Sequence, residues 1–306
     1  MKKSVEVLMS TYNGEKYIEK QIETIMNQID VDVHLTIRDD GSTDGTIRIV
    51  RQLIDCYPDR IKVIEGKNIG YRRSFLETFN YAEEMEYYCF ADQDDIWKPE
   101  KLIHAIEKLE LVSDDIKLYV SSLNIVDENL KMISYKDISK NPNSIESYFT
   151  RGRFAGCTFV FSKELKDTIV GLVDFSIPEI SMPDHDFFVA SCAYAFGSVC
   201  VDRESYMLHI RHNDSVTSGG NGIKKRIKGE YNLLFRRKDV HYNMANVLLK
   251  ADKAVVNGKT HIFLQLVASY KENLRNRLRL LMCRECTCGN FLCDIESKIK
   301  ILLLNY

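Results

Sequence analysis

Residues 87–97 read YYCFADQDDIW, an apolar run that ends in three carboxylates within four residues. The apolar part, Tyr87–Ala91, is typical of a buried strand, and Asp92, Asp94 and Asp95 follow where that strand would end. Neighbouring carboxylates repel one another strongly unless a cation lies among them. Hard oxygen ligands suit Mg²⁺ or Mn²⁺, which complete their coordination with water and phosphate oxygens. The sequence therefore predicts a metal site beyond a strand, with a structural acidic loop before the next helix as the alternative.

Short apolar runs alternate with amphipathic stretches on both sides of this segment. Strands are predicted at Val5–Met9, Val33–Ile37, Ile61–Ile64, Tyr87–Ala91 and Ile116–Ser121, and helices at Glu15–Gln28, Asp44–Leu53, Arg72–Met85 and Pro99–Leu111. Strands that alternate with helices predict an α/β fold with a doubly wound, mostly parallel sheet. Ligands of such sheets bind at the carboxyl ends of the strands.

The second half of the chain is less regular. Further strands are predicted at Cys157–Phe161 and Ser198–Asp202, and helices at Lys163–Gly171 and His185–Phe196. Residues 122–150 are polar and weakly periodic, and we expect them to form an insertion or lid. After residues 218–220 the pattern becomes helical, without a convincing strand. We predict one domain over residues 1–220 and a helical C-terminal region over residues 221–306.

The composition excludes several classes of protein. The chain has 306 residues, 45% of them hydrophobic, and 42 Lys and Arg against 44 Asp and Glu, so its formal net charge is −2. This is an ordinary globular composition with no overall attraction to nucleic acid. The N-terminus does not resemble a signal peptide, and no run approaches the roughly 18 apolar residues of a membrane-spanning helix. We expect a cytoplasmic protein, with peripheral contact at the inner face of the membrane as a further expectation.

Two segments near the C-terminus favour more than one interpretation. Residues 223–240 hold seven basic residues interleaved with apolar ones, which suits either an amphipathic helix on an anionic membrane or a solvated helix packed on the preceding domain. A cysteine cluster follows at Cys283, Cys286, Cys288 and Cys293. Four thiolates could hold zinc, but the tight spacing favours free thiols.

Polar residues also follow the other predicted strands. They are found in Ser10–Gly14, Arg38–Gly45 and Asn68–Gly70. Each is compatible with an ordinary turn, but the sheet topology brings all of them to the same edge as Asp92–Asp95. No G-x-G-x-x-G follows the first strand and no P-loop motif occurs, which argues against a Rossmann dehydrogenase or a P-loop nucleotidase. These segments predict a nucleotide site of another kind.

These motifs together resemble the family 2 glycosyltransferases of the GT-A fold. The matching segments are residues 7–14, 39–46, 68–70 and 90–97, in this order and spacing. The form Asp-Gln-Asp-Asp-Ile-Trp is similar to the bacterial branch that includes rhamnosyltransferases of surface-polysaccharide assembly. The resemblance implies a nucleotide-sugar half over about residues 1–115 and an acceptor half over about residues 116–220.

The resemblance also implies roles for residues of the nucleotide-sugar half. Asp39 or Asp40 would accept the N3–H of a uracil or thymine ring, because an ionised carboxylate is only an acceptor. Asp92 and Asp94 would hold the ribose and the metal ion, Mn²⁺ or Mg²⁺. The remaining candidate residues for binding the nucleotide sugar are Thr11, Tyr12, Asn13, Asn68, Gly70, Arg72, Arg73, Gln93, Asp95 and Trp97.

For the acceptor half the resemblance implies a general base and a third metal ligand. An inverting transfer needs a base that takes the proton of the acceptor hydroxyl. Asp186 matches this position, Asp184 is its rival or a helix cap, and His212 is the third metal ligand. The implied donor is a UDP- or dTDP-sugar, and the acceptor a saccharide or lipid-linked saccharide. A sugar-1-phosphate nucleotidyltransferase and a non-catalytic nucleotide-binding scaffold are the alternatives.

Overall fold

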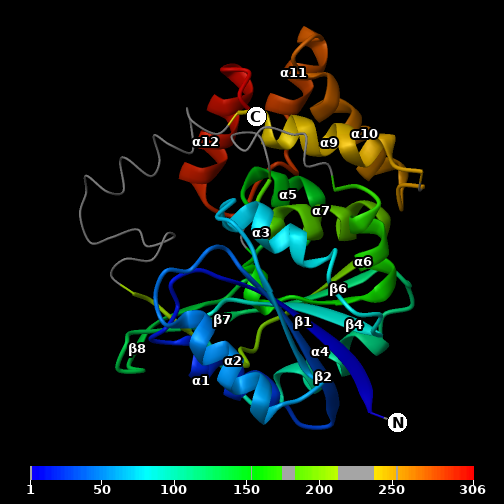
Figure 1. Cartoon of the computed structure of the whole chain (residues 1–306). Coiled ribbons are helices and arrows are strands. Elements are labelled where there is room, and N and C mark those ends of the chain that lie inside the picture. Colours follow the sequence, from blue (N-terminus) through cyan, green and yellow to red (C-terminus); the bar gives the residue numbers. More distant parts are fainter. Residues whose placement is uncertain (1, 153, 174–182, 213–237, 253) are drawn as a thin grey trace. The chain divides into compact units, whose positions relative to one another are not determined.

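The computed structural model describes residues 2–152, 154–173, 183–212, 238–252 and 254–306 (Figure 1). The chain divides into two compact units. The first unit consists of Met1–Ile138, Phe154–Val173 and Ser198–Arg211, and the second of Ser139–Arg153, Asp174–Gly197 and His212–Tyr306. The domain boundary predicted near residue 220 falls outside the described residues and stays a prediction.

A seven-stranded sheet forms the centre of the first unit. Its order is β10 (Ser198–Asp202), β6 (Lys117–Ser121), β9 (Val160–Ser162), β4 (Tyr87–Ala91), β1 (Lys3–Thr11), β2 (Val31–Asp39) and β3 (Ile61–Glu65). Neighbouring strands are parallel, except that β9 runs antiparallel to both β4 and β6. The predicted mostly parallel sheet is therefore confirmed. Parallel order brings the carboxyl ends of β1, β2 and β4 to one edge.

Helices cover both faces of this sheet. They are α1 (Ile18–Met26), α2 (Thr46–Cys56), α3 (Tyr71–Thr78), α4 (Lys101–Glu110) and α6 (Lys163–Val170). Figure 1 shows α3 and α6 on one face and α1, α2 and α4 on the other. Val5, Val7 and Met9 of β1 belong to one buried cluster with apolar residues of α1 and α4. Because β1 is buried on both faces, its sequence is nearly continuous in apolar residues rather than alternating.

Residues 122–150, which we expected to form an insertion or lid, contribute two strands to a second sheet. A second sheet of the first unit has the order β5 (Ile96–Trp97), β11 (Met207–Ile210), β7 (Leu123–Val126) and β8 (Met132–Lys136). These strands have two to five residues, and β8 is exposed along its whole length. Such strands carry little periodic signal, and their pairing depends on segments far apart in the sequence. The predicted strand Cys157–Phe161 is also shorter, since Gly156–Thr158 forms a 3₁₀ turn before β9.

The second unit is helical in its described residues. Its helices are α5 (Ile145–Thr150), α7 (His185–Phe196), α9 (Val240–Lys250), α10 (Gly258–Ser269), α11 (Leu274–Leu281) and α12 (Phe291–Leu302). An aromatic cluster joins them: the His241 ring is stacked on Tyr306 at 4.3 Å, and Phe149 contacts Phe187 and Phe263. From residue 238 on, the described residues form helices and no strand, as predicted. None of the helices in the described ranges is long and apolar enough to cross a membrane.

Candidate functional site

Four side chains gather beyond β4 in the first unit. Single ligand atoms of Asp92, Asp95, Cys157 and His209 all lie within 4.8 Å of one another. The Nδ1 atom of His209 is 2.9 Å from Oδ1 of Asp95, whose side chain is fully buried. Asp92 and Asp95 follow β4, Cys157 lies in the turn before β9, and His209 lies on β11. The cluster therefore depends on both sheets.

Burial determines the protonation of this acidic cluster. Burial and the charge of Asp95 raise the pKa of Asp92 to about 6, and burial also raises the pKa of Asp95. Burial alone would lower the pKa of His209, but its hydrogen bond to Asp95 and the nearby carboxylates raise it to about 9. Burial keeps the pKa of Cys157 well above its ordinary value, so this residue is a thiol. Cation and anion thus stabilise each other in the His209–Asp95 pair.

A buried lysine lies beside these residues. The Nζ atom of Lys101 is 3.4 Å from the centre of the Trp97 ring and has no hydrogen-bond partner among the described residues. Burial lowers its pKa, while the charges of Asp95 and Asp92 act in the opposite direction. The predicted role of Trp97 in sugar binding was inferred from its motif. In the structure Trp97 is buried and its ring covers the lysine, which is a cation–π contact.

The carboxylates fit a divalent cation. Asp92 and Asp94 are half-buried, and Oδ2 of the buried Asp95 has no hydrogen-bond partner in the described part of the chain. A buried carboxylate oxygen without a donor is costly, and a cation would satisfy it. Asp92 and Asp95 supply the hard oxygen ligands that Mg²⁺ or Mn²⁺ prefers, whereas the protonated Cys157 thiol is a poor ligand for either ion. Asp94 is their neighbour in the chain but does not belong to this group of close ligand atoms.

The segment after β4 is fastened to the end of β1 through Gln93. Its Oε1 atom accepts hydrogen bonds from Oγ1 of Thr11 at 2.6 Å and from the backbone N–H of Tyr12 at 3.0 Å, and its Nε2 atom donates to the carbonyl of Tyr12. A Cβ atom on Gly14 would lie 2.5 Å from Oε1 of Gln93, so a larger residue there would displace the Gln93 side chain from these hydrogen bonds. Thr11 is buried and Tyr12 is exposed, which leaves the Tyr12 ring available to a ligand.

The loops after β1 and β2 are joined by similar hydrogen bonds. The N–H of Asn13 donates to Oγ of Ser42, and Oδ1 of Asn13 accepts from the N–H of Thr43. Oδ2 of Asp39 accepts from the N–H groups of Gly41 and Ser42, and the Ser42 hydroxyl donates to Oδ1. Asp39 is therefore buried, but its donors are all neighbours in its own loop.

Asp40 belongs to a different network. Its carboxylate accepts from Arg38 at 2.6 Å and from the N–H groups of Ile69 and Gly70, so it holds the turn after β3. Arg38, which is itself buried, also donates to Glu77 and Ser74. Gly70 has a φ of 84°, a conformation that favours glycine. Asn68 lies exposed in this turn, and Arg72 and Arg73 lie half-buried in the first turn of α3.

The predicted base and the third predicted metal ligand belong to the second unit. Asp184 is the residue before α7, but its side chain makes no capping hydrogen bond, and Asp186 lies in the first turn. Oδ1 of Asp186 accepts from the N–H of Phe187 at 2.6 Å, and the Tyr148 hydroxyl donates to the Asp186 carbonyl. The N-terminus of a helix stabilises the ionised form of such an acid. His212 is buried.

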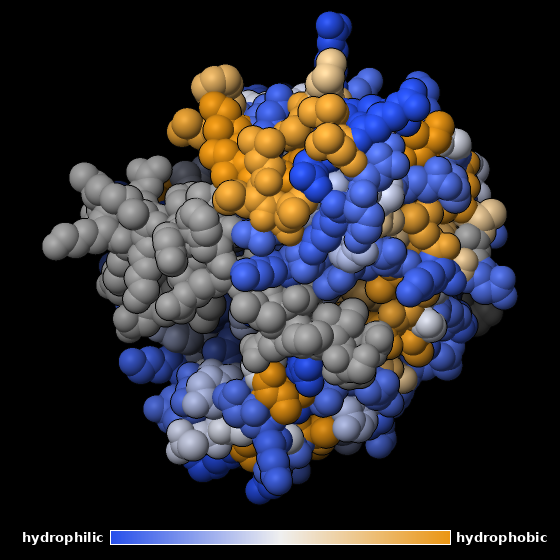
Figure 2. Space-filling view, turned by 90° about the horizontal axis from the view of Figure 1, so that it is seen from above, coloured by the Kyte–Doolittle hydropathy of each residue, from blue (hydrophilic) through white to orange (hydrophobic). Residues whose placement is uncertain are grey.

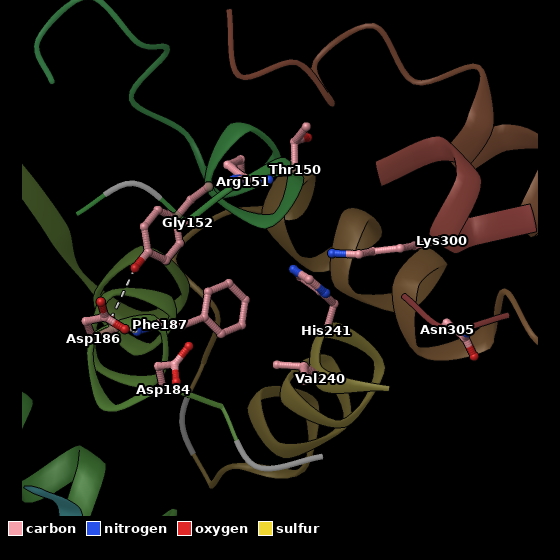
Figure 3. A pocket seen from close by; sticks show the side chains of 11 residues that line it. Thr150, Arg151, Gly152, Asp184, Asp186, Phe187, Val240, His241, Lys300 and Asn305 are labelled. Atoms are coloured by element: carbon pink, nitrogen blue, oxygen red, sulfur yellow. Dashed lines mark hydrogen bonds between the residues drawn. The ribbon is translucent and has the colours of Figure 1, made fainter. Parts of the chain in front are cut away.

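Asp184 and Asp186 line a pocket of about 270 Å³. Figure 3 shows these two residues on one side and His241 and Lys300 on the other. Arg151 also lines the pocket and, like Lys300, is paired with Glu296. The pocket therefore combines two acids with three basic side chains, all from the second unit.

Sequence reasoning missed several residues of these sites. Cys157 and Lys101 were not recognised as neighbours of the acids, and His212 was preferred over His209. Arg38 was quoted only as part of a loop. The only available signal was that polar residues such as Lys101 and His209 interrupt segments that otherwise belong to the core. Among the described residues, the cysteines from Cys283 to Cys293 form no group of three close ligand atoms, and none of them is in a disulfide bond.

Comparisons with known proteins identify the family to which the chain belongs. The model of the family described as "Glycosyl transferase family 2" matches residues 6–164. The dTDP-rhamnosyl transferase RfbG of Shigella flexneri is 31% identical over 271 residues, which cover 82% of this chain and 87% of that protein. An uncharacterized glycosyltransferase of Nostoc sp., alr2836, is 35% identical over 129 residues, 42% of this chain and 39% of that protein.

Solved structures share the fold. The structure of S. aureus TarS 1-349 in complex with UDP-GlcNAc has a TM-score of 0.59 and 18% identity, over 98% of this chain and 90% of that one. The mannosyltransferase PcManGT from Pyrobaculum calidifontis, in complex with GDP-Man and Mn²⁺, has a TM-score of 0.52 and 16% identity, over 99% and 88%. The family model covers more than half of the chain, and the Shigella relative extends over most of it. The chain therefore belongs to glycosyl transferase family 2 and is a glycosyltransferase of the GT-A fold.

Proposed function

We propose that this enzyme is an inverting glycosyltransferase that moves a sugar from a UDP- or dTDP-sugar to a saccharide or lipid-linked acceptor in bacterial surface-polysaccharide synthesis. Rhamnose is the first candidate sugar, because the Shigella relative is named a dTDP-rhamnosyl transferase. The observation that carries the proposal is the set of acids beyond β4, where the buried Oδ2 of Asp95 meets no hydrogen-bond donor from the described residues.

Asp39 is our candidate for recognising the base. Asp40 is neutralised by Arg38 and holds the turn after β3, so its carboxylate is committed to the fold. Asp39 has no such ion pair among the described residues, and its donors are loop groups two and three residues further on. An ionised carboxylate accepts the N3–H of uracil or thymine and rejects a ring nitrogen that lacks a proton.

Asp92 and Asp94 would hold Mn²⁺ or Mg²⁺, and His212 is proposed as a further ligand. When bound, the ion neutralises the negative charge that develops on the departing diphosphate. The chain itself holds the acids in place: Gln93 ties their loop to β1, and His209 fixes the orientation of Asp95. Rigid placement of charged groups lowers the reorganisation needed during the reaction.

Asp186 would take the proton of the attacking hydroxyl, with Asp184 as its rival. Asp186 is fixed at one oxygen by the Phe187 N–H, which orients the carboxylate. The adjacent pocket contains Arg151, His241 and Lys300, whose donors suit an acceptor rich in hydroxyl groups or bearing phosphate. A base within hydrogen-bond reach of the acceptor hydroxyl would assist attack on the anomeric carbon.

Release of nucleoside diphosphate from UDP- and dTDP-sugars tests the proposal. We expect release with Mn²⁺ or Mg²⁺ but not with excess EDTA, and a loss of about 100-fold or more in Asp94→Asn. Asp55→Asn, which changes an exposed acid of α2, is the matched control. Full activity of Asp94→Asn in the presence of EDTA would contradict the metal role. A thermal-shift series with UDP, dTDP, GDP and ADP identifies the base, because the tightest ligand stabilises most.

A further inference from the structure

The α11–α12 region of the second unit exposes an unusual amount of apolar surface. The exposed side chains are Leu274, Leu278 and Met282 at α11, and Phe291, Leu292 and Leu302 on α12, which we call the apolar patch. Met282 is 79% exposed, Phe291 76% and Leu292 75%. Figure 2, which looks down on this side, shows a broad apolar area bordered by hydrophilic residues. Scattered apolar side chains are normal on a surface, but a contiguous group of this kind marks an interaction site.

Helix α12 has an apolar stripe on its outer side. Phe291, Ile295, Ile299 and Leu302 recur at intervals of three or four residues, so they share one face, and all are exposed. Ser297 and Ile301 lie on the opposite, buried face. A solvated helix normally turns its polar face outward. The outer face of α12 is therefore built for an apolar environment.

Helix α11 repeats the pattern and adds positive charge. Leu274 and Leu278 are one turn apart, and Met282 is a turn further on. Arg275 and Arg279 are exposed beside this stripe. Residues 274–304 contain six basic and three acidic residues, although the whole chain has a net charge of −2. Positive charge is therefore concentrated where the apolar side chains are exposed.

From this combination we infer that the apolar patch docks on an anionic lipid bilayer, with its leucines, Met282 and Phe291 in the interface and the arginines at the headgroups. Apolar side chains flanked by basic ones are the arrangement that binds such a surface. A second copy of the chain fits less well, because a symmetric contact would bring the two sets of basic residues together. Membrane contact was predicted from residues 223–240, most of which lie outside the described residues, so that interpretation stays a prediction. The inference rests on the proposed function in one respect: a lipid-linked acceptor would make binding to a membrane useful to the enzyme.

Co-sedimentation of the full chain with vesicles tests this inference without any sugar donor. We expect binding to phosphatidylcholine vesicles that contain phosphatidylglycerol, much weaker binding to phosphatidylcholine alone, and weaker binding as NaCl is raised. The double variant Phe291→Ser/Leu292→Ser should bind about tenfold or more weakly, since it removes the two most exposed apolar side chains of α12. Arg275→Gln/Arg279→Gln should reduce the preference for the anionic vesicles.

Leu111→Ser is the matched control, because Leu111 is 84% exposed but lies in the first unit. It should bind vesicles as the unchanged protein does. Circular dichroism and nucleotide-induced thermal shifts of all variants should be unchanged, so that a failure of vesicle binding is distinguished from a failure of the proposed activity. Equal binding of the double variant, or no binding of the unchanged protein, overturns the inference. Self-association that the double variant abolishes, without vesicle binding, would instead identify a second copy as the occupant.

Discussion

The first unit holds its acids at the ends of parallel strands, whereas the second unit gathers its acids between helices. In the first unit, loops after β1, β2 and β3 are tied together by side chain–backbone hydrogen bonds such as Asn13–Thr43 and Asp40–Gly70. In the second unit, the pocket beside Asp186 is lined by residues from four separate segments of the chain. The comparison shows that the acids of the strand-end site are adjacent in the sequence and can be found there, while the residues of the site between helices come together only by packing.

Replacement of the proposed base gives the largest effect and tests the pocket of the second unit. We expect Asp186→Asn to lower kcat by about 10²–10⁴-fold, because it removes the proton acceptor. Donor affinity, measured by thermal shift with the nucleotide, should not change. Asp184→Asn is the comparison variant, and a larger loss there would exchange the two roles. If neither variant loses activity, the second unit does not supply the base.

Breaking the buried Arg38–Asp40 pair should show how strongly the first unit depends on its network. Arg38→Met leaves the Asp40 carboxylate buried without its cation, which costs about 3–5 kcal/mol in the free energy of unfolding. Arg151→Met of the second unit breaks a partly exposed pair with Glu296 and should cost about 1 kcal/mol or less. Urea unfolding measures both. Equal losses of stability in the two variants would show that the ion pairs of the two units do not differ in this way.

The buried Glu6 on β1 should make stability dependent on pH. Burial raises its pKa from 4.5 to about 7, so the folded state holds a proton that the unfolded state loses. The folded state is therefore most favoured at low pH, and up to about 3 kcal/mol is lost as the pH rises from 4.5 through 7. Glu6→Gln should remove this loss and be more stable than the unchanged protein at pH 8. Glu19→Gln, at an exposed position of α1, should leave the pH profile unchanged.

Phe291→Ser should have the smallest effect on stability. The side chain is largely exposed, so its removal should change the free energy of unfolding by less than about 0.5 kcal/mol. Thermal unfolding of the protein without vesicles provides the measurement. A loss of stability above about 1 kcal/mol would mean that another part of the folded chain covers the Phe291 face of α12. The apolar patch would then not be an exposed surface, and the contrast with the buried acids of the first unit would fail.

Most of the first unit could be predicted because its signals are local. The runs at Val5–Met9 and Tyr87–Ala91 are apolar because these strands are buried on both faces, and Asp92–Asp95 follow them directly. The four-stranded sheet could not be predicted in this way. Its strand β5 has two residues, and β8 lacks an apolar face toward the core. Their order depends on pairing with β7 and β11, which no local pattern encodes.

The sequence was enough to predict the alternation of strands and helices, and with it a parallel sheet, because this pattern lies in residues that are neighbours in the chain. The acidic segment beyond β4 could be found for the same reason. The tertiary structure alone decided that His209 rather than His212 pairs with Asp95, that Lys101 lies against Trp97, and that Asp40 is held by Arg38. These pairs join residues on different strands, helices and loops or depend on burial. The direction and burial of these side chains are set only when the helices and strands pack together, so they cannot be predicted from residue spacing in the sequence.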